Sequence, residues 1–127
     1  MKMNKLLKLD NIMYKVSDLD KASKLYIDVL GLKQLWRDDK SKMVGLGMEN
    51  SSAEIVLQAD PNLPNFDFSY SVDNVEDFIA EATKKGFTLS FGPIEVRIGK
   101  YSVLEDEDHN KIPIIDLTKF GGVLQYD

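Results

Sequence analysis

The sequence predicts an α+β fold made of two βαβββ modules in tandem, and three observations support this. A strand-like alternation followed by a helical stripe lies between residues 10 and 32, and the same pattern returns between residues 67 and 87. Each helical segment follows a residue that caps helices and stops at a glycine. Three strand-like segments then complete each copy. We expect the modules to form curved mixed sheets around a cavity.

The first copy begins with a half-buried strand, because apolar Ile12, Tyr14 and Val16 alternate with the residues between them. Asp18 can accept hydrogen bonds from the first free amides of a helix, and Gly31 can end that helix in a left-handed conformation. The apolar stripe expected on this helix consists of Ala22, Leu25, Tyr26, Val29 and Leu30. Strands are then predicted at residues 32–37, 43–48 and 53–59.

The second copy keeps the register of the first. Adding 56 to the numbers of Ile12, Tyr14, Val16 and Asp18 gives Phe68, Tyr70, Val72 and Asn74. A helix is predicted from Val75 to Lys85 with the stripe Val75, Phe78, Ile79 and Ala82. Strands follow near residues 87–90, 100–105 and 111–117, and Gly92-Pro93 is expected to interrupt the structure between them.

These patterns place the whole chain, residues 1–127, in a single domain. Module one covers about residues 9–59, a connector with two prolines covers 60–65, and module two covers about 66–118. The chain is too short for two independent enzymatic domains.

The composition excludes several functional classes. A net charge of −5 argues against nucleic acid and anionic membranes, because both require a basic surface. There is no cysteine, so neither a disulfide framework nor thiolate chemistry is available. The only short apolar run near the N-terminus is too short for a signal peptide or a membrane span, and a cytoplasmic location is expected.

Residues on the strand faces turned away from the helices are candidates for a binding site. They alternate with the helix-facing residues and are more polar: Asn11, Met13, Lys15, Asp67, Ser69 and Ser71. Lys15 and Asp67 occupy similar places in the two modules, so they can form an ion pair. Such a pair serves either to stabilise the structure or to bind a ligand. Trp36 and Arg37 are adjacent on a strand, so one of them faces the cavity. Trp36 and Tyr101 suit either an aromatic wall or core packing.

The chain resembles the vicinal oxygen chelate superfamily, which includes glyoxalase I, extradiol dioxygenases and bleomycin-resistance proteins. The resemblance covers nearly the whole chain. It rests on the first strand with Asp18-Leu19, on the segment Tyr26 to Leu32, on Val72-Asp73-Asn74-Val75 and on the turn from Asp106 to Asn110. It implies the tandem βαβββ fold and a concave side where family enzymes hold a divalent metal ion.

The positions that the resemblance assigns to metal ligands contain Asn11, Val56, Asp67 and Pro113. Val56 and Pro113 have no donor atom in their side chains, and one carboxylate does not make a tight metal site. A shifted register would instead turn Glu54 or Gln58 inward. We therefore expect no metal ion and no cofactor, and we assign no catalytic residue.

Two other features have a simple structural explanation. His109 is the only histidine, and a solvated turn explains it better than catalysis. The acidic run Glu105 to Asp108 lacks the spacing of a calcium loop, so a solvated turn is the preferred interpretation.

We predict a metal-free protein that binds or sequesters a small organic molecule, cationic or aromatic in character. It is most similar to the bleomycin-resistance branch, which acts by sequestration and suggests a homodimer that exchanges modules or completes the cavity with its partner. The expected cavity residues are Asn11, Met13, Lys15, Trp36, Val56, Asp67, Ser69, Ser71, Tyr101 and Pro113. The alternatives are a metal-dependent lyase, isomerase or dioxygenase similar to glyoxalase I, and a non-enzymatic protein-interaction domain.

Overall fold

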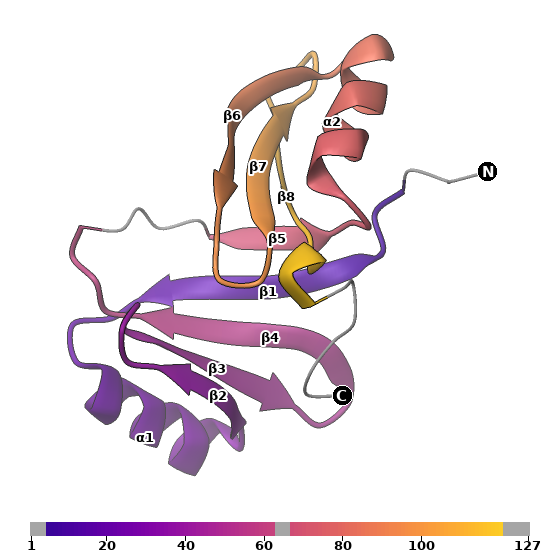
Figure 1. Cartoon of the computed structure of the whole chain (residues 1–127). Coiled ribbons are helices and arrows are strands. Elements are labelled where there is room, and N and C mark those ends of the chain that lie inside the picture. The colour runs from indigo at the N-terminus through magenta and orange to yellow at the C-terminus, as the bar shows by residue number, and fades with distance from the viewer. Residues whose placement is uncertain (1–4, 63–66, 121–127) are drawn as a thin grey trace. The chain divides into compact units, whose positions relative to one another are not determined.

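The computed structural model describes residues 5–62 and 67–120, and these residues form two compact units. One unit consists of residues 10–68, and the other combines the residues up to 9 with those from 69 onward. Within the described ranges each unit packs an α-helix against a sheet (Figure 1). This confirms the α+β class and the two-module organisation.

The sheet of the first unit has the strand order β2-β3-β4-β1. Its elements are β1 (Lys8–Lys15), α1 (Leu19–Leu30), β2 (Lys33–Asp38), β3 (Met43–Met48) and β4 (Ser51–Gln58). β1 runs parallel to β4, whereas β2, β3 and β4 are antiparallel neighbours. The sheet is therefore mixed, and β2, β3 and β4 begin and end within two residues of the predicted positions, whereas β1 begins earlier than predicted, at Lys8.

α1 begins and ends where the sequence predicts. The side chain of Asp18 accepts a hydrogen bond from the amide of Lys21 at 3.0 Å. Gly31 has a φ of 75°, a left-handed conformation that costs glycine little because it has no Cβ.

The predicted apolar stripe of α1 was wrong at three of its positions. Leu25, Val29 and Leu30 are 58%, 69% and 60% exposed. The side chains that pack onto the sheet are instead Leu19, Ala22, Tyr26 and Ile27. These four residues have the spacing of one helix face that begins at Leu19. The buried face of the helix is therefore rotated relative to the predicted one, and Leu25 and Val29 lie on the side away from the sheet.

Tyr14 was also expected beneath this helix, but it is 46% exposed. α1 packs mainly on β3 and β4, whereas β1 is the last strand in this unit's order. The ring of Tyr14 lies beside that of Tyr26 on the helix, with the two centroids 6.2 Å apart.

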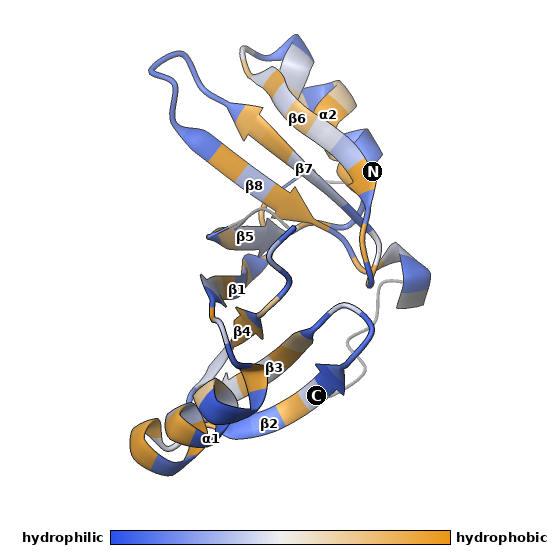
Figure 2. Ribbon diagram, turned by 90° about the vertical axis from the view of Figure 1, so that its left-hand side faces the viewer, coloured by the Kyte–Doolittle hydropathy of each residue, from blue (hydrophilic) through white to orange (hydrophobic). Residues whose placement is uncertain are grey.

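The second unit repeats the connectivity with the strand order β5-β8-β7-β6. Its elements are β5 (Phe68–Ser71), α2 (Val75–Lys84), β6 (Thr88–Glu95), β7 (Lys100–Glu105), β8 (Lys111–Ile115) and a 3₁₀ turn (Thr118–Phe120) that was not predicted. β5 runs parallel to β8, as β1 does to β4. In Figure 2, hydrophilic and hydrophobic residues alternate along most of β8, whereas the hydrophobic residues of β7 lie together toward its C-terminal end. The predicted stripe of α2 is confirmed, because Val75, Phe78, Ile79 and Ala82 all pack in the core of this unit.

β6 corrects the prediction that the strand ends before Gly92-Pro93. The strand continues through these residues to Glu95, with the peptide bond between Gly92 and Pro93 in the cis form. Its pairing with β7 shifts register twice, between Leu89 and Phe91 and between Phe91 and Ile94. Because β6 is an edge strand, it accommodates a proline and two irregularities without breaking a central ladder.

The carboxylate of Asp116 links three parts of the second unit. Asp116 is 1% exposed. Its Oδ2 accepts the amide N–H of Val75 at 2.8 Å, and its Oδ1 accepts the amide of Lys100 at 2.9 Å and the hydroxyl of Thr118 at 2.7 Å. A Cβ at Gly99 would lie 2.1 Å from Oδ1, so only glycine permits this approach. The buried charge therefore holds the start of α2 against the strands.

The strands of the two units cover residues 8–58 and 68–115. In the connector, the side chain of Asp60 accepts a hydrogen bond from the amide of Asn62 at 2.9 Å, as in a turn. The rest of the predicted connector, residues 63–65, lies outside the described residues. Among the described residues, no helix is long and apolar enough to cross a membrane.

Candidate functional site

The side of the first sheet that α1 leaves uncovered carries predicted site residues. Cross-strand partners share a face, and the register pairs Met13 with Val56, Val56 with Gly45, and Gly45 with Trp36. The alternate residues Val44, Leu46 and Leu57 pack under the helix. We call this side the first free face; it comprises Asn11, Met13, Lys15, Lys33, Trp36, Asp38, Met43, Gly45, Gly47, Glu54, Val56 and Gln58.

Arg37 identifies which of the two adjacent residues faces the free side. Its Nη1 lies 2.7 Å from a carboxylate oxygen of Asp20 on α1, and its Nε lies 2.7 Å from Asp39. Arg37 is therefore on the helix side, and Trp36 is on the first free face. The hydrogen bonds to Asp39 and Asp20 raise the pKa of the Arg37 guanidinium.

Trp36 is held in one position by a glycine and a glutamate. Its Nε1 donates a hydrogen bond to Oε1 of Glu54 at 2.6 Å. A Cβ at Gly45 would lie 2.0 Å from the same Nε1 and 2.2 Å from Cε2, so the indole occupies the space that a side chain would need. Glu54 is 7% exposed, whereas the tryptophan remains half-buried. The first free face therefore contains a fixed aromatic ring beside a buried carboxylate.

The predicted residues of β1 lie across from β4 on this face. Asn11 is opposite Glu54, and its Nδ2 donates to Oδ2 of Asp10 at 2.9 Å. Lys15 is opposite Gln58, and its Nζ donates to the carbonyl of Pro61 at 3.4 Å. The structure therefore brings Asn11, Met13, Lys15, Trp36 and Val56 onto one surface.

Asp67 precedes β5 and differs from the strand residues around it. It is exposed and has a φ of 53°, and its carbonyl accepts the amide of Met13 at 2.6 Å. The backbone of Asp67 is thereby fixed next to β1. Its left-handed conformation is one that aspartate and asparagine tolerate better than most residues.

The remaining predicted residues lie in the second unit. Ser71 and Tyr101 are both opposite Ile115, and Pro113 is opposite Val103, so this group shares the face away from α2. Tyr101 is 3% exposed, and its ring centroid lies 6.3 Å from that of Phe91. Ser69 is 2% exposed, and its hydroxyl makes no hydrogen bond.

The metal positions implied by the family do not fit a metal ion in this chain. Val56 and Pro113 are buried strand residues with hydrocarbon side chains, and Asn11 supplies only a neutral amide. Glu54 lies on the first free face, but its Oε1 accepts the indole N–H of Trp36. Across the described residues, no group of three or more histidine, cysteine, aspartate or glutamate side chains is arranged to hold a metal ion.

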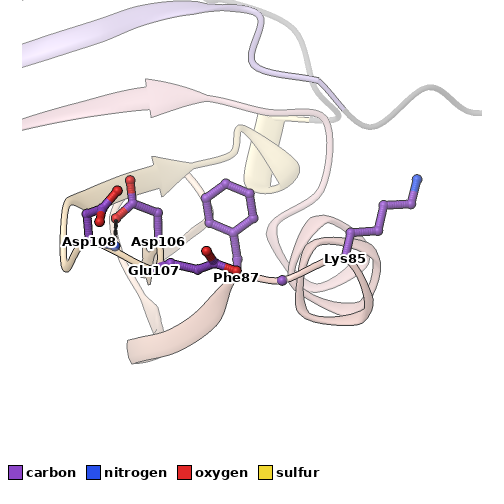
Figure 3. A pocket seen from close by; sticks show the side chains of 6 residues that line it. Lys85, Phe87, Asp106, Glu107 and Asp108 are labelled. Atoms are coloured by element: carbon purple, nitrogen blue, oxygen red, sulfur yellow. Dashed lines mark hydrogen bonds between the residues drawn. The ribbon is translucent and has the colours of Figure 1, made fainter.

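The acidic turn between β7 and β8 lines a pocket of about 250 Å³ with the end of α2. Figure 3 shows Phe87 between the carboxylates and Lys85, whose side chain extends away from them. Asp106 accepts the amides of Asp108 and Asn110, both at 2.9 Å, within the turn itself. The side-chain hydrogen bond from Asn110 and these amides lower the pKa of Asp106.

His109 lies in the same turn with an 83% exposed side chain, and its Nδ1 is 2.8 Å from Glu105. Glu105 also pairs with Lys111, and hydrogen bonds from His109 and Lys111 lower the pKa of the Glu105 carboxyl. These carboxylates stabilise the turn, as the solvated-turn interpretation predicts.

Sequence reasoning gave Glu54 and Gly45 too little weight. Glu54 lies two residues before Val56, so the strand period already placed it on the same face without any shift of register. The contact between Gly45 and Trp36 depends on the pairing of β2 with β3, which includes a register shift after Gln34. No sequence pattern signals that shift.

The fold and this arrangement define a class. Two consecutive βαβββ modules, each with its first and last strands paired in parallel and with one face that its helix does not cover, are the architecture of vicinal oxygen chelate proteins. The chain belongs to the Glyoxalase/Bleomycin resistance protein/Dioxygenase superfamily, whose family model matches residues 8–114.

Comparison with known proteins gives relatives from several branches. A probable chloroplastic lactoylglutathione lyase of Arabidopsis thaliana is 27% identical over 121 residues, covering 84% of this chain and 35% of the relative. The chain thus spans about a third of that relative's length. This similarity is to the glyoxalase branch, and it does not confirm the resemblance to the bleomycin-resistance branch that we expect from the sequence.

Among solved structures, methylmalonyl-CoA epimerase from Mycobacterium tuberculosis is similar with a TM-score of 0.64 and 17% identity, covering 90% of each chain. The epimerase of Streptomyces coelicolor has a TM-score of 0.64 and 14% identity, covering 87% of this chain and 96% of the other. A 2,3-dioxygenase of a Pseudomonas species has a TM-score of 0.59 and 20% identity, covering 89% of this chain and 41% of the other. At these identities the similarity supports the fold alone.

Proposed function

We propose that this chain binds a small organic molecule without a metal ion, in the manner of the bleomycin-resistance members of its superfamily. One observation carries the proposal: two of the four positions assigned to metal ligands, Val56 and Pro113, have no donor atom. Neutral Asn11 and the single carboxylate of Asp67 do not make up for that loss. The scaffold therefore retains its free faces but lacks the chelating set.

The chemistry of the first free face supports binding of an organic molecule. Trp36 provides a half-buried aromatic surface and Asn11 a half-buried amide, while Met13 and Val56 form the buried apolar layer beneath them. Small-molecule sites usually combine apolar and aromatic lining with a few placed polar groups.

The test uses the purified full chain after treatment with a chelator. Thermal melts are recorded with nickel, zinc, manganese and iron(II), and separately with a panel of cationic, neutral and anionic aromatic compounds. A ligand at about one hundred times its Kd stabilises by about 2.7 kcal/mol, which raises the Tm by several degrees. We expect such a rise with at least one compound and none with the metals. A large rise with one metal, and none with any compound, would reject the proposal.

A metal-dependent lyase or isomerase is the second candidate, favoured by the similarity to the probable lactoylglutathione lyase. That function requires a chelating set beyond the four assigned positions. Stoichiometric metal binding would support this candidate and the absence of binding would support ours.

Asp67 provides a prediction within the proposed site. Asp67→Asn removes the charge but tolerates the φ of 53°. We expect the variant to fold with an unchanged melting temperature and to bind a cationic compound from the panel several-fold more weakly, measured by calorimetry. Asp73→Asn removes a charge that is also exposed, at a position outside the proposed site, and should bind as the wild type does. Equal affinities of wild type and Asp67→Asn would remove Asp67 from the site.

We also propose that the chain forms a homodimer in solution, as the resemblance to the bleomycin-resistance branch suggests. Exposed Leu25 and Val29 on α1 supply apolar surface that association would cover. Sedimentation equilibrium should give twice the chain mass of 14.4 kDa. A single-chain mass at micromolar concentration would contradict the dimer.

A further inference from the structure

From the geometry around Trp36 we propose that the first free face selects cationic ligands, and that the buried carboxylate of Glu54 makes this possible through the indole ring. The inference rests on the proposed function and specifies its ligand class: planar or quaternary ammonium cations. Trp36 is the ligand-contacting residue, and Glu54 is a positioning residue that acts through it.

The first step of the argument concerns the electron density of the indole. The Nε1–H of Trp36 donates to Oε1 of Glu54 at 2.6 Å, a short distance for such a bond. An anionic acceptor on the N–H polarises the ring and makes its faces more negative. Cations bind to aromatic faces through that negative potential, and tryptophan is the best of the aromatic residues for this.

The second step concerns rigidity. The indole fills the space above Gly45, and its N–H is fixed by Glu54, so the ring is positioned before any ligand arrives. A ring that is already ordered loses little further entropy when a ligand binds. The half-buried state of Trp36 leaves part of the ring accessible, while Glu54 is 7% exposed behind it.

The third step concerns the other charges of this face. Lys15 lies opposite Gln58, four residues along β4 from Glu54, and Lys33 lies opposite Gly47, which is itself opposite Glu54. At about 3.3 Å per strand residue and about 4.8 Å between strands, Lys15 is about 13 Å and Lys33 about 10 Å from Glu54 along the sheet, and both distances exceed the screening length at physiological salt. Asp38, opposite Met43, adds a second negative charge to this face. The net charge of −5 also favours the approach of cations.

The test uses three compounds that share one ring system: 1-methylquinolinium as the cation, quinoline as the neutral compound, and quinoline-4-carboxylate as the anion, all at pH 7.5. Trp36 is the only tryptophan, so quenching of its emission reports binding at this ring. Calorimetry supplies the dissociation constants. We expect the cation to bind about tenfold more tightly than quinoline.

The variants separate the role of Glu54 from a general effect of charge. Glu54→Gln keeps an acceptor for the indole but removes the charge, and it should abolish the preference for the cation while leaving quinoline affinity unchanged. Glu49→Gln removes a charge from an exposed turn residue and should retain the full preference. Trp36→Phe should lower the affinity for the cation by calorimetry. Circular dichroism confirms that each variant is folded.

Three results would overturn the inference: no binding of the cation, equal affinity for the cation and quinoline, or equal losses in Glu54→Gln and Glu49→Gln. Binding of quinoline or the carboxylate without preference for the cation would leave metal-free binding intact and remove only the cation selectivity. If none of the three compounds binds but a compound of the wider panel raises the Tm, metal-free binding again stands and the cation selectivity is rejected.

Discussion

The indole ring of Trp36 on the first free face occupies space that is open only because Gly45 has no side chain. Gly45 leaves room for the indole of Trp36 on the neighbouring strand, and Glu54 on the third strand accepts its N–H. Three strands thus contribute one residue each to one local arrangement. All three residues belong to one unit.

Gly45→Ala tests this arrangement. Its Cβ would lie 2.0 Å from Nε1 of Trp36, so the ring must move and its hydrogen bond to Glu54 must lengthen or break. We expect a loss of about 1–3 kcal/mol in the free energy of unfolding and a shift of the tryptophan emission maximum. Chemical denaturation followed by fluorescence measures both. Gly47→Ala is the control, because its nearest neighbour is a flexible leucine side chain at 3.0 Å. Equal effects of the two variants would show that Gly45 has no special role.

At the same scale, alternation along β1, β4 and β5 was enough to predict which residues share a free face, including Met13 and Val56. It did not reveal that Trp36 would lie on the free side rather than Arg37, because β2 contains an extra residue between Gln34 and Trp36 in its pairing with β3. The ion pair of Arg37 with Asp20 joins residues from different elements, which a local pattern does not show.

Among the elements, α2 depends on a residue that lies outside it. Asn74 caps α2 in the expected way, accepting the amide of Asp77 at 3.0 Å. Asp116, after β8, binds the amide of Val75 from a position 41 residues away. The start of this helix is therefore set partly by the helix itself and partly by the sheet.

Asp116→Ala should be clearly more destabilising than Asn74→Ala. It leaves the buried amides of Val75 and Lys100 without their acceptor, which costs about 2–4 kcal/mol. Loss of the Asn74 cap alone costs about 1 kcal/mol. Urea denaturation of both variants and the wild type provides the comparison. If Asp116→Ala were as stable as Asn74→Ala, the long-range cap would contribute little.

Caps and strand positions were predictable at the element scale because their signals are local. The stripe on α1 was not, because both Leu25 and Tyr26 fit an apolar repeat and only the placement of β3 and β4 selects Tyr26. The path of β6 through Gly92 and Pro93 was missed for a related reason: an edge strand tolerates what a central strand does not.

For the whole molecule, the repeat of βαβββ connectivity accounts for the family membership, while the residues on the free faces account for the proposed function. In the proposed function the family's scaffold is retained, but Val56 and Pro113 occupy two of the positions that the resemblance assigns to metal ligands. The ligand itself was not predictable, because its identity depends on side chains brought together by pairing rather than by sequence spacing.

The most direct test of metal-free binding is the metal content of the purified full chain. The protein is dialysed against an equimolar mixture of nickel, zinc, manganese and iron(II), passed through a desalting column, and analysed by plasma mass spectrometry. We predict far less than one metal ion per chain, unchanged in Asp67→Asn. One tightly held ion per chain, lost in Asp67→Asn, would contradict the account.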